Sequence, residues 1–137
     1  MQLVVWLVVE VVAWPAAAGA GAQPRVSQGR FMPEGGEFRF DVSVFQRPAR
    51  PWVNVLANPG FGCVISESGV GYSWSENAHE FRLTPWSDDP VGATGGEALY
   101  LRDEDSGAVW SPTAWPAISA SRDYRCRHGM GYSVFEH

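Results

Sequence analysis

The feature that most constrains this chain is a short-period alternation of apolar and polar residues, interrupted by turn residues every few positions. From Arg30 onward, alternating runs occupy residues 37–45, 52–58, 61–68, 72–75, 97–103 and 123–137. No window keeps the 3.6-residue period of an amphipathic helix. Many short strands at this spacing are typical of a sandwich or barrel. The sequence therefore predicts an all-β fold, an antiparallel β-sandwich, with hairpin turns such as the one at residues 104–107.

Composition places the chain among folded, acidic, single-domain proteins. Its 137 residues suffice for one core, and 45% hydrophobic with 13% aromatic residues argues against disorder. A net charge of −5 leaves no basic patch to neutralise phosphates, so nucleic acid is not an expected partner. The chain has no lysine. A chain that uses arginine in place of lysine favours binding of carboxylates, phosphates or sugar hydroxyls by the planar, forked guanidinium group. A GC-rich genome would give the same bias toward arginine.

The cysteines and histidines show no metal-ligand spacing. Cys63 and Cys126 lie far apart and no CxxC motif accompanies them, so a zinc site is not expected. Two buried free thiols are the favoured interpretation, and a disulfide is the alternative if the chain is exported. We expect no cofactor and no metal.

The N-terminus has an unusual composition. Residues 1–14 are almost wholly apolar, and Ala20, Gly21 and Ala22 resemble a signal-peptidase site. No basic residue precedes the run, Glu10 interrupts it, and it is too short to span a bilayer. A signal peptide, an amphipathic helix, a strand, or an upstream segment read from a wrong start codon remain open. Residues 15–28 are predicted to form a flexible Ala/Gly linker.

The last run, residues 132–137, is strand-like, and the sequence ends inside it. An unpaired apolar edge is a liability for a sheet. We therefore expect an incomplete sandwich that belongs to a larger domain.

A resemblance to a known family is carried by three segments: "PWVNVLANPGFGCVISESGVGYSWSENAHEFRLTPWSDDPV", "GEALYLRDEDSGAVWSPT" and "RHGMGYSVFEH". They resemble the N-terminal β-sandwich of glycoside hydrolase family 94, formerly glycosyltransferase family 36. This family includes cellobiose and chitobiose phosphorylases and cyclic β-1,2-glucan synthases, and the motifs look closest to the synthase branch. The resemblance covers residues 29–137, which we treat as the sandwich region, and residues 1–28 do not match.

The resemblance implies inverting phosphorolysis of β-glucosides, with inorganic phosphate as co-substrate and an oligosaccharide or β-glucan as substrate. In the family, the general acid and the phosphate site lie in an (α/α)6 barrel downstream of the sandwich. No catalytic residue is therefore assigned here, and the chain alone is expected to be inactive. The missing barrel and, through a homodimer, a second subunit are the expected partners. The resemblance also suggests a location in the cytoplasm or on the cytoplasmic side of the inner membrane, and secretion is a second possibility.

The acidic residues present do not suggest an independent active site. Inverting glycosidases need two carboxyl groups roughly 6.5–9.5 Å apart. Asp88 and Asp89 are adjacent and point to opposite sides of an extended backbone, and the acids at 103–105 sit in a hairpin turn. The glycine-rich pieces "GVGY" and "GATGG" precede no helix, so a phosphate cradle is not expected.

The loop "LTPWSDDPV" is the candidate sugar contact. Pro85 and Pro90 stiffen it, so Trp86 would be displayed with Asp88 beside it. Pyranose C–H faces pack on indole while hydroxyl groups bind carboxylates and arginine, which makes Arg82 the third candidate. Tyr72 and Trp74 are weaker candidates. The alternative is packing: Trp86 plugs the sandwich edge or docks it onto the barrel, Arg82 pairs with an acid, and Tyr72 or Trp74 belongs to the core.

Three functional hypotheses follow. The first is a sandwich fragment of a glycan phosphorylase or cyclic-glucan synthase, which scaffolds the barrel and helps to shape its sugar site. The second is a stand-alone carbohydrate-binding module without catalysis. The third is a nonfunctional truncated reading frame.

Overall fold

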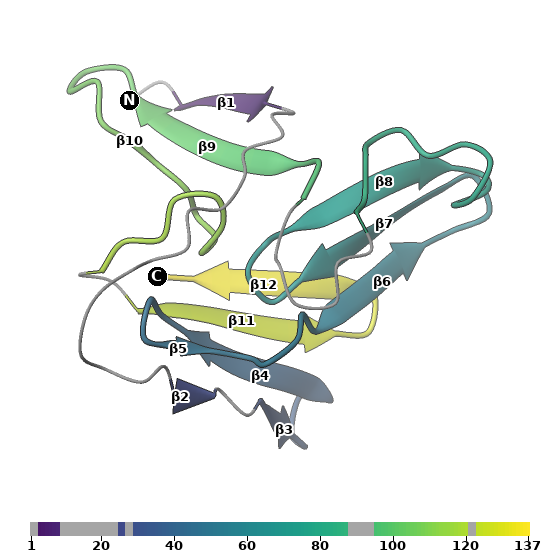
Figure 1. Cartoon of the computed structure of the whole chain (residues 1–137), viewed down its shortest axis with the longest axis horizontal. Coiled ribbons are helices and arrows are strands. Elements are labelled where there is room, and N and C mark those ends of the chain that lie inside the picture. The colour runs from purple at the N-terminus through teal and green to yellow at the C-terminus, as the bar shows by residue number, and fades with distance from the viewer. Residues whose placement is uncertain (1–2, 9–24, 27–28, 88–94, 121–122) are drawn as a thin grey trace.

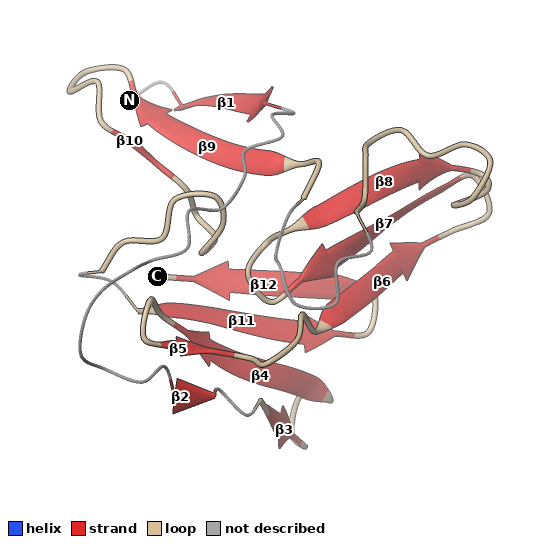
Figure 2. Cartoon of the chain, in the orientation of Figure 1, coloured by secondary structure: helices blue, strands red, loops and turns tan. Residues whose placement is uncertain are grey.

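The computed structural model describes residues 3–8, 25–26, 29–87, 95–120 and 123–137. Every regular element in these ranges is a strand, which confirms the predicted all-β class (Figure 2). Within the same ranges, no helix is long and apolar enough to cross a membrane.

In the ranges that the structure describes, twelve strands form four sheets (Figure 1). In spatial order, the sheets are β1-β9-β10, β12-β11-β4-β3, β2-β5 and β6-β7-β8. All pairings are antiparallel except that of β2 with β5. The strands are β1 Leu3–Val8, β2 Arg25–Val26, β3 Arg30–Met32, β4 Glu37–Val42, β5 Gln46–Arg47, β6 Val53–Ala57, β7 Phe61–Ser66, β8 Gly71–Ser75, β9 Ala98–Asp103, β10 Val109–Trp110, β11 Tyr124–Gly129 and β12 Tyr132–Glu136.

The strands follow the alternation of the sequence. In β7, Gly62, Val64 and Ser66 are buried, whereas the intervening residues are half-buried or exposed. This places Phe61, Cys63 and Ile65 on one face, as the period of two predicts. β9 and β10 form the predicted hairpin, with Asp103 N–H bonded to the Ala108 carbonyl at 2.8 Å.

The N-terminal segment takes part in two pairings. Leu3–Val8 forms a strand antiparallel to β9, which is one of the alternatives left open by the sequence. Arg25–Val26, near the end of the predicted Ala/Gly linker, pairs with Gln46–Arg47. A short extended segment can satisfy its backbone hydrogen-bonding groups at a strand edge in this way. The rest of the linker lies outside the described residues.

Among the described residues, two clusters of buried side chains form the core. The first joins β4 and β11 and contains Phe40, Val42, Ala114, Tyr124 and Cys126. The second contains Val70, Ala98 and Trp115, with Trp86 and Tyr100 packed against it. Neither cysteine is in a disulfide. Cys126 is buried, as predicted, and Cys63 is half-buried.

The Asn54 side chain joins two sheets. Its Nδ2 donates to the carbonyls of Gly129 and Tyr132, both at 2.9 Å, and to Ser133 Oγ at 3.2 Å. Asn54 lies on β6, and its three acceptors belong to the last residue of β11 and the first two residues of β12. β12 is the edge strand of its sheet.

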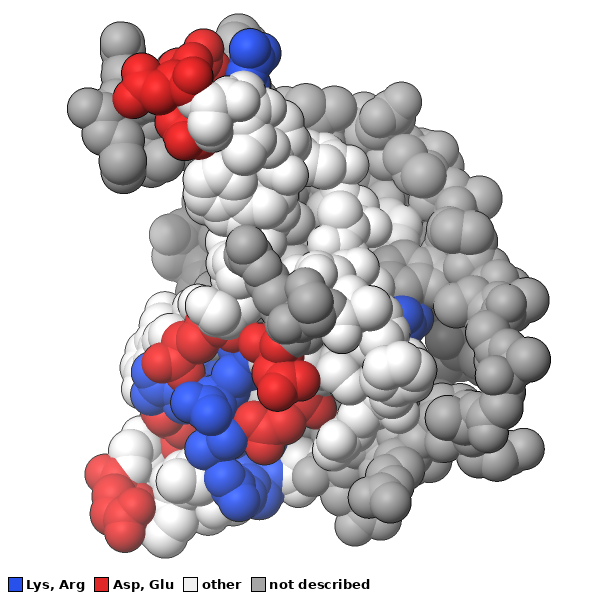
Figure 3. Space-filling view, turned by 90° about the vertical axis from the view of Figure 1, so that its left-hand side faces the viewer, with Lys and Arg blue, Asp and Glu red and all other residues white. Residues whose placement is uncertain are grey.

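One face of the β12-β11-β4-β3 sheet is covered by ion pairs. The Arg127 guanidinium donates to Glu37 at 2.8 Å and lies 3.4 Å from Glu136, and Arg39 donates to Asp41 at 2.7 Å. Figure 3 shows acidic and basic side chains interspersed in one group. Hydrogen bonds from Tyr132 and then Arg127 hold the pKa of Glu37 below its usual value.

Candidate functional site

The loop after β8 folds back and extends the β6-β7-β8 sheet. Leu83 N–H donates to the Ser73 carbonyl at 2.9 Å, and Ser75 N–H donates to the Phe81 carbonyl at 3.0 Å. Trp74 and Arg82 lie opposite each other in this pairing. Residues 81–84 therefore act as a further edge segment, which brings the sequence-predicted loop beside β8.

Four of the five predicted site residues meet around Tyr72. Its ring lies 5.2 Å from that of Trp86 and 5.5 Å from that of Trp74, tilted by 43° and 40°. The Arg82 guanidinium carbon lies 4.9 Å above the centre of the Tyr72 ring, a cation–π contact. We call Tyr72, Trp74, Arg82 and Trp86 the Tyr72 cluster. Asp88, the fifth candidate, lies outside the described residues.

The members of the Tyr72 cluster differ in their burial. Trp74 is 8% exposed and its indole covers Gly62, so it belongs to the core. Tyr72 and Trp86 are half-buried, and Trp86 packs against the second core cluster. The sequence predicted that the Trp86 side chain is displayed on its loop. The structure shows this only in part, because the Trp86 indole packs against the second core cluster.

Arg82 is the exposed member of the cluster. Its Nε donates to the Ala78 carbonyl at 3.4 Å. No ion pair with an acid is found for it among the described residues. Its guanidinium is held over an aromatic ring, a position from which its forked N–H groups can reach a ligand.

A carboxylate that the sequence did not single out fixes the loop. Glu97 Oε1 accepts hydrogen bonds from Ser73 Oγ at 2.6 Å and Thr84 Oγ1 at 2.7 Å. Thr84 Oγ1 also accepts from Ser73 N–H at 2.8 Å. Burial, and after it the Glu97 charge, raises the pKa of the nearby Cys63 thiol. Glu97 was missed because its partners lie 24 and 13 residues away in sequence.

The acids of the β9–β10 turn have a local structural role. Asp103 accepts hydrogen bonds from Ser106 Oγ at 2.6 Å and from the N–H of Asp105 at 3.1 Å. The hydrogen bond from Ser106, followed by that from the Asp105 N–H, lowers the pKa of Asp103. This is the turn chemistry that the sequence predicted for the 103–105 acids.

The Tyr72 cluster offers apolar ring faces beside a guanidinium. Aromatic faces suit the C–H faces of pyranose rings, and arginine suits hydroxyl groups. The arrangement fits the binding of a polyhydroxylated ligand.

Comparison with known proteins identifies the family. Residues 37–137 match the supersandwich domain of glycosyl hydrolase 94. A cyclic β-(1,2)-glucan synthase from Rhizobium meliloti is 39% identical over 107 residues, which are 78% of this chain and 4% of that protein. An N,N′-diacetylchitobiose phosphorylase from Vibrio proteolyticus is 37% identical over 89 residues, which are 63% of this chain and 11% of that protein.

A more distant relative gives the same result. A solabiose phosphorylase from Paenibacillus borealis is 30% identical over 115 residues, which are 79% of this chain and 14% of that protein. The chain thus spans 4% to 14% of the length of these three relatives. By its supersandwich domain, this chain belongs to glycoside hydrolase family 94.

Proposed function

We propose that this chain is the sandwich portion of a glycan phosphorylase or cyclic β-1,2-glucan synthase-like protein. In the complete protein it would scaffold a catalytic (α/α)6 barrel and help to shape the sugar site. The observation that carries the proposal is the match of residues 37–137 to the supersandwich domain, since the relatives named above are phosphorylases and a glucan synthase.

The Tyr72 cluster is the part of the sandwich that would meet the sugar. This proposal is supported by the contact between the half-buried rings of Tyr72 and Trp86 and by the exposed Arg82 guanidinium above Tyr72. Glu97 holds the loop that carries Arg82 and Trp86. Inorganic phosphate would be the co-substrate, bound by the barrel together with the general acid. The ligand would be an oligosaccharide or β-glucan. The complete protein would act as a homodimer, in the cytoplasm or on the cytoplasmic side of the inner membrane.

The test begins with the gene. Sequencing onward from the His137 codon should reveal a long helical-repeat region, and the complete product should release a sugar 1-phosphate from a β-glucan and phosphate. The 137-residue chain serves as the control, which we expect to release none. A complete product with no such activity on any β-linked glucan would count against the proposal.

A second candidate function is a stand-alone carbohydrate-binding module. The exposed Arg82 over Tyr72 favours it, because this contact is present in the chain by itself. Millimolar binding of β-gluco-oligosaccharides by the isolated chain, lost in Trp86→Ala with folding retained, would support this function. Absence of binding would exclude it.

A further inference from the structure

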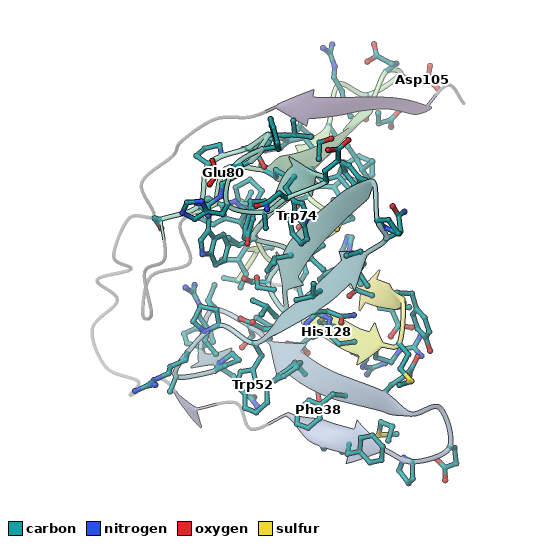
Figure 4. All side chains as sticks on the ribbon, turned by 90° about the vertical axis from the view of Figure 1, so that its right-hand side faces the viewer. Phe38, Trp52, Trp74, Glu80, Asp105 and His128 are labelled. Atoms are coloured by element: carbon teal, nitrogen blue, oxygen red, sulfur yellow. The ribbon has the colours of Figure 1, made fainter. Side chains whose placement is uncertain are left out.

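His128 lies where the β6-β7-β8 sheet meets the β12-β11-β4-β3 sheet, and each of its ring nitrogens has a partner. Nε2 lies 3.3 Å from the carbonyl oxygen of Trp52, the residue before β6, and Nδ1 lies 2.9 Å from Ser133 Oγ on β12. Figure 4 shows Trp52 and His128 close together, in a different part of the molecule from Trp74. The sugar contact proposed for the Tyr72 cluster gives this histidine no role.

The partners of the ring determine which nitrogen carries its proton. A carbonyl oxygen only accepts hydrogen bonds, so Nε2 is the donor to Trp52. In a neutral imidazole the other nitrogen is an acceptor, and Nδ1 therefore accepts from the Ser133 hydroxyl group. Ser133 Oγ in turn accepts from Asn54 Nδ2 at 3.2 Å. The bonds run in one direction, from Asn54 through Ser133 and His128 to Trp52, and this direction requires a neutral ring.

The Trp52 backbone also binds Glu67, the residue after β7. Trp52 N–H donates to Glu67 Oε2 at 2.8 Å, and the Trp52 carbonyl accepts from Glu67 N–H at 3.0 Å. The Trp52 indole stacks on Phe38 of β4, with ring centres 5.3 Å apart. Trp52 is thus held from both sheets, and the bond from His128 closes the contact between them. We define the His128 junction as Trp52, Asn54, Glu67, His128 and Ser133.

The titratable groups on the His128 side of the sheet offer no negative charge to a protonated ring. The Cys126 sulfur lies 3.6 Å from Nδ1, but burial raises the pKa of this thiol to about 12, so it stays uncharged. Burial raises the pKa of Glu67 from 4.5 to about 6, so this carboxyl group becomes neutral as the pH falls. His137, at the far end of β12, stacks on Tyr124.

The remaining charged side chains of these strands point away from His128. Side chains alternate between the two faces of a sheet along each strand. The alternation and the observed register place six of them on the opposite, ion-paired face: Glu37, Arg39, Asp41, Arg125, Arg127 and Glu136. In the part of the chain that the structure describes, no salt bridge involves His128.

We propose that His128 is a proton-operated switch: the neutral ring closes the junction between the two sheets, and the protonated ring opens it. Protonation places a hydrogen on Nδ1, which then donates to Ser133 Oγ, so the Ser133 hydroxyl group loses its acceptor. It also places a positive charge in a half-buried position without a counterion, which is unfavourable. The inference goes beyond the proposed function, because it involves neither a sugar nor a catalytic barrel.

The direction of the pH effect follows from the burial of the ring. Burial lowers the pKa of His128 in the native state, whereas a histidine in the unfolded chain has a pKa of about 6.5. The stabilisation that a neutral His128 gives to the junction is therefore fully present above pH 6.5. It is lost as the pH falls through the lowered pKa.

The first test is a ¹⁵N NMR spectrum of the histidine rings in the 137-residue chain. The chemical shifts of the two ring nitrogens show which of them carries the proton. At about pH 7.5, where an ordinary imidazole is neutral, we expect the His128 proton on Nε2. A proton on Nδ1 at this pH would overturn the inference, because the bonds to Trp52 and Ser133 would then not form as described.

The second test is hydrogen exchange at the Glu67 backbone amide and the Asn54 side-chain amide, each corrected for the rate of a free amide at the same pH. In the wild type, protection should fall about tenfold between about pH 7.5 and about pH 5, equivalent to about 1.4 kcal/mol, the size of one hydrogen bond. His128→Gln keeps a donor for the Trp52 carbonyl but does not titrate, so its protection should stay constant. His79→Gln is the matched control, because the His79 side chain is 87% exposed and lies outside the junction, and it should behave as the wild type.

Glu67→Gln separates the two titratable groups of the junction. A fall in protection that remains in this variant supports His128 as the switch, whereas a fall that disappears assigns it to Glu67 and overturns the inference. Protection that does not change with pH in the wild type, or that falls equally in His128→Gln, also overturns it. If His128→Gln does not fold, the Glu67→Gln result decides.

Discussion

The indole of Trp74 lies directly against the α-carbon of Gly62 on the neighbouring strand, so that a methyl group at Gly62 would overlap the ring. The two residues are paired in the β7–β8 ladder, and both are buried. The close approach of the ring depends on the absence of a side chain at position 62.

Gly62→Ala should therefore destabilise the domain by about 1–3 kcal/mol, the usual cost of overpacking a core. Urea unfolding followed by tryptophan fluorescence would measure the loss. Gly60→Ala is the matched control, because a methyl group at Gly60 meets only Asn58 Oδ1, at 3.8 Å. Equal stabilities of the two variants would contradict the packing described for Trp74.

Stability should depend on pH through Glu67. Burial, opposed by hydrogen bonds from backbone N–H groups, raises the pKa of this carboxyl group from 4.5 to about 6. The native state then binds the Glu67 proton more tightly than the unfolded chain does. Its contribution is therefore fully present below pH 4.5, and about 2 kcal/mol is lost as the pH rises through 6.

Glu67→Gln isolates this effect, since the amide oxygen can still accept from Trp52 N–H. The free energies of unfolding of wild type and variant should diverge between pH 4.5 and 7, with the wild type losing more. Burial lowers the pKa of His128, so this residue makes the free energy of unfolding rise with pH over the same range. The quantity to compare is therefore the difference between wild type and Glu67→Gln at each pH. Parallel pH profiles of the free energy of unfolding for the two proteins would show that folding does not raise the pKa of Glu67.

The Glu97 network should control the order of the loop that carries Arg82 and Trp86. Thr84→Val keeps the shape of the side chain but removes one donor to Glu97 and the acceptor for Ser73 N–H. We expect a loss of about 1–2 kcal/mol. Hydrogen exchange at the Leu83 amide, which bonds to the Ser73 carbonyl, should accelerate.

Glu80→Gln alters an exposed acid at the start of the same loop and serves as the control. Its effect on exchange at Leu83 should be negligible. If Thr84→Val left the exchange of Leu83 unchanged, Glu97 would not hold the loop.

The two thiols should differ in reactivity. Burial, and then the Glu67 charge, raises the pKa of Cys126 to about 12, and this side chain is 1% exposed. Cys63 is half-buried, with a pKa raised to a smaller degree. In the native state, a thiol reagent such as dithiobis(nitrobenzoic acid) should label Cys63 slowly and Cys126 only after unfolding.

Cys63→Ser and Cys126→Ser assign the two rates. The Cys63→Ser variant should react only when denatured, whereas Cys126→Ser should retain the slow native reaction. Rapid labelling of both thiols in the native chain would indicate that the first core cluster is not formed.

Local patterns predicted the strands well because each strand carries its own period of two. β4, β7 and β9 were recognisable from the residues within them, and the β9–β10 hairpin from its turn. The contacts of Glu97 with Ser73 and Thr84, and the stack of Trp52 on Phe38, join distant segments and depend on how the sheets pack. No local period encodes such contacts. The burial of Trp74 was left open by the sequence for the same reason, since it depends on Gly62.

The amide of Asn54 makes the β6-β7-β8 sheet and the β12-β11-β4-β3 sheet mechanically dependent on each other. A single nitrogen serves three acceptors where β11 meets β12, so sliding β6 along β12 would break all three bonds together. Trp52, the residue before β6, adds a further link, because its carbonyl lies 3.3 Å from His128 Nε2 on β11. A displacement of one sheet would thus be transmitted to the other, which couples the sheet that carries Trp74 to the sheet that carries Phe38.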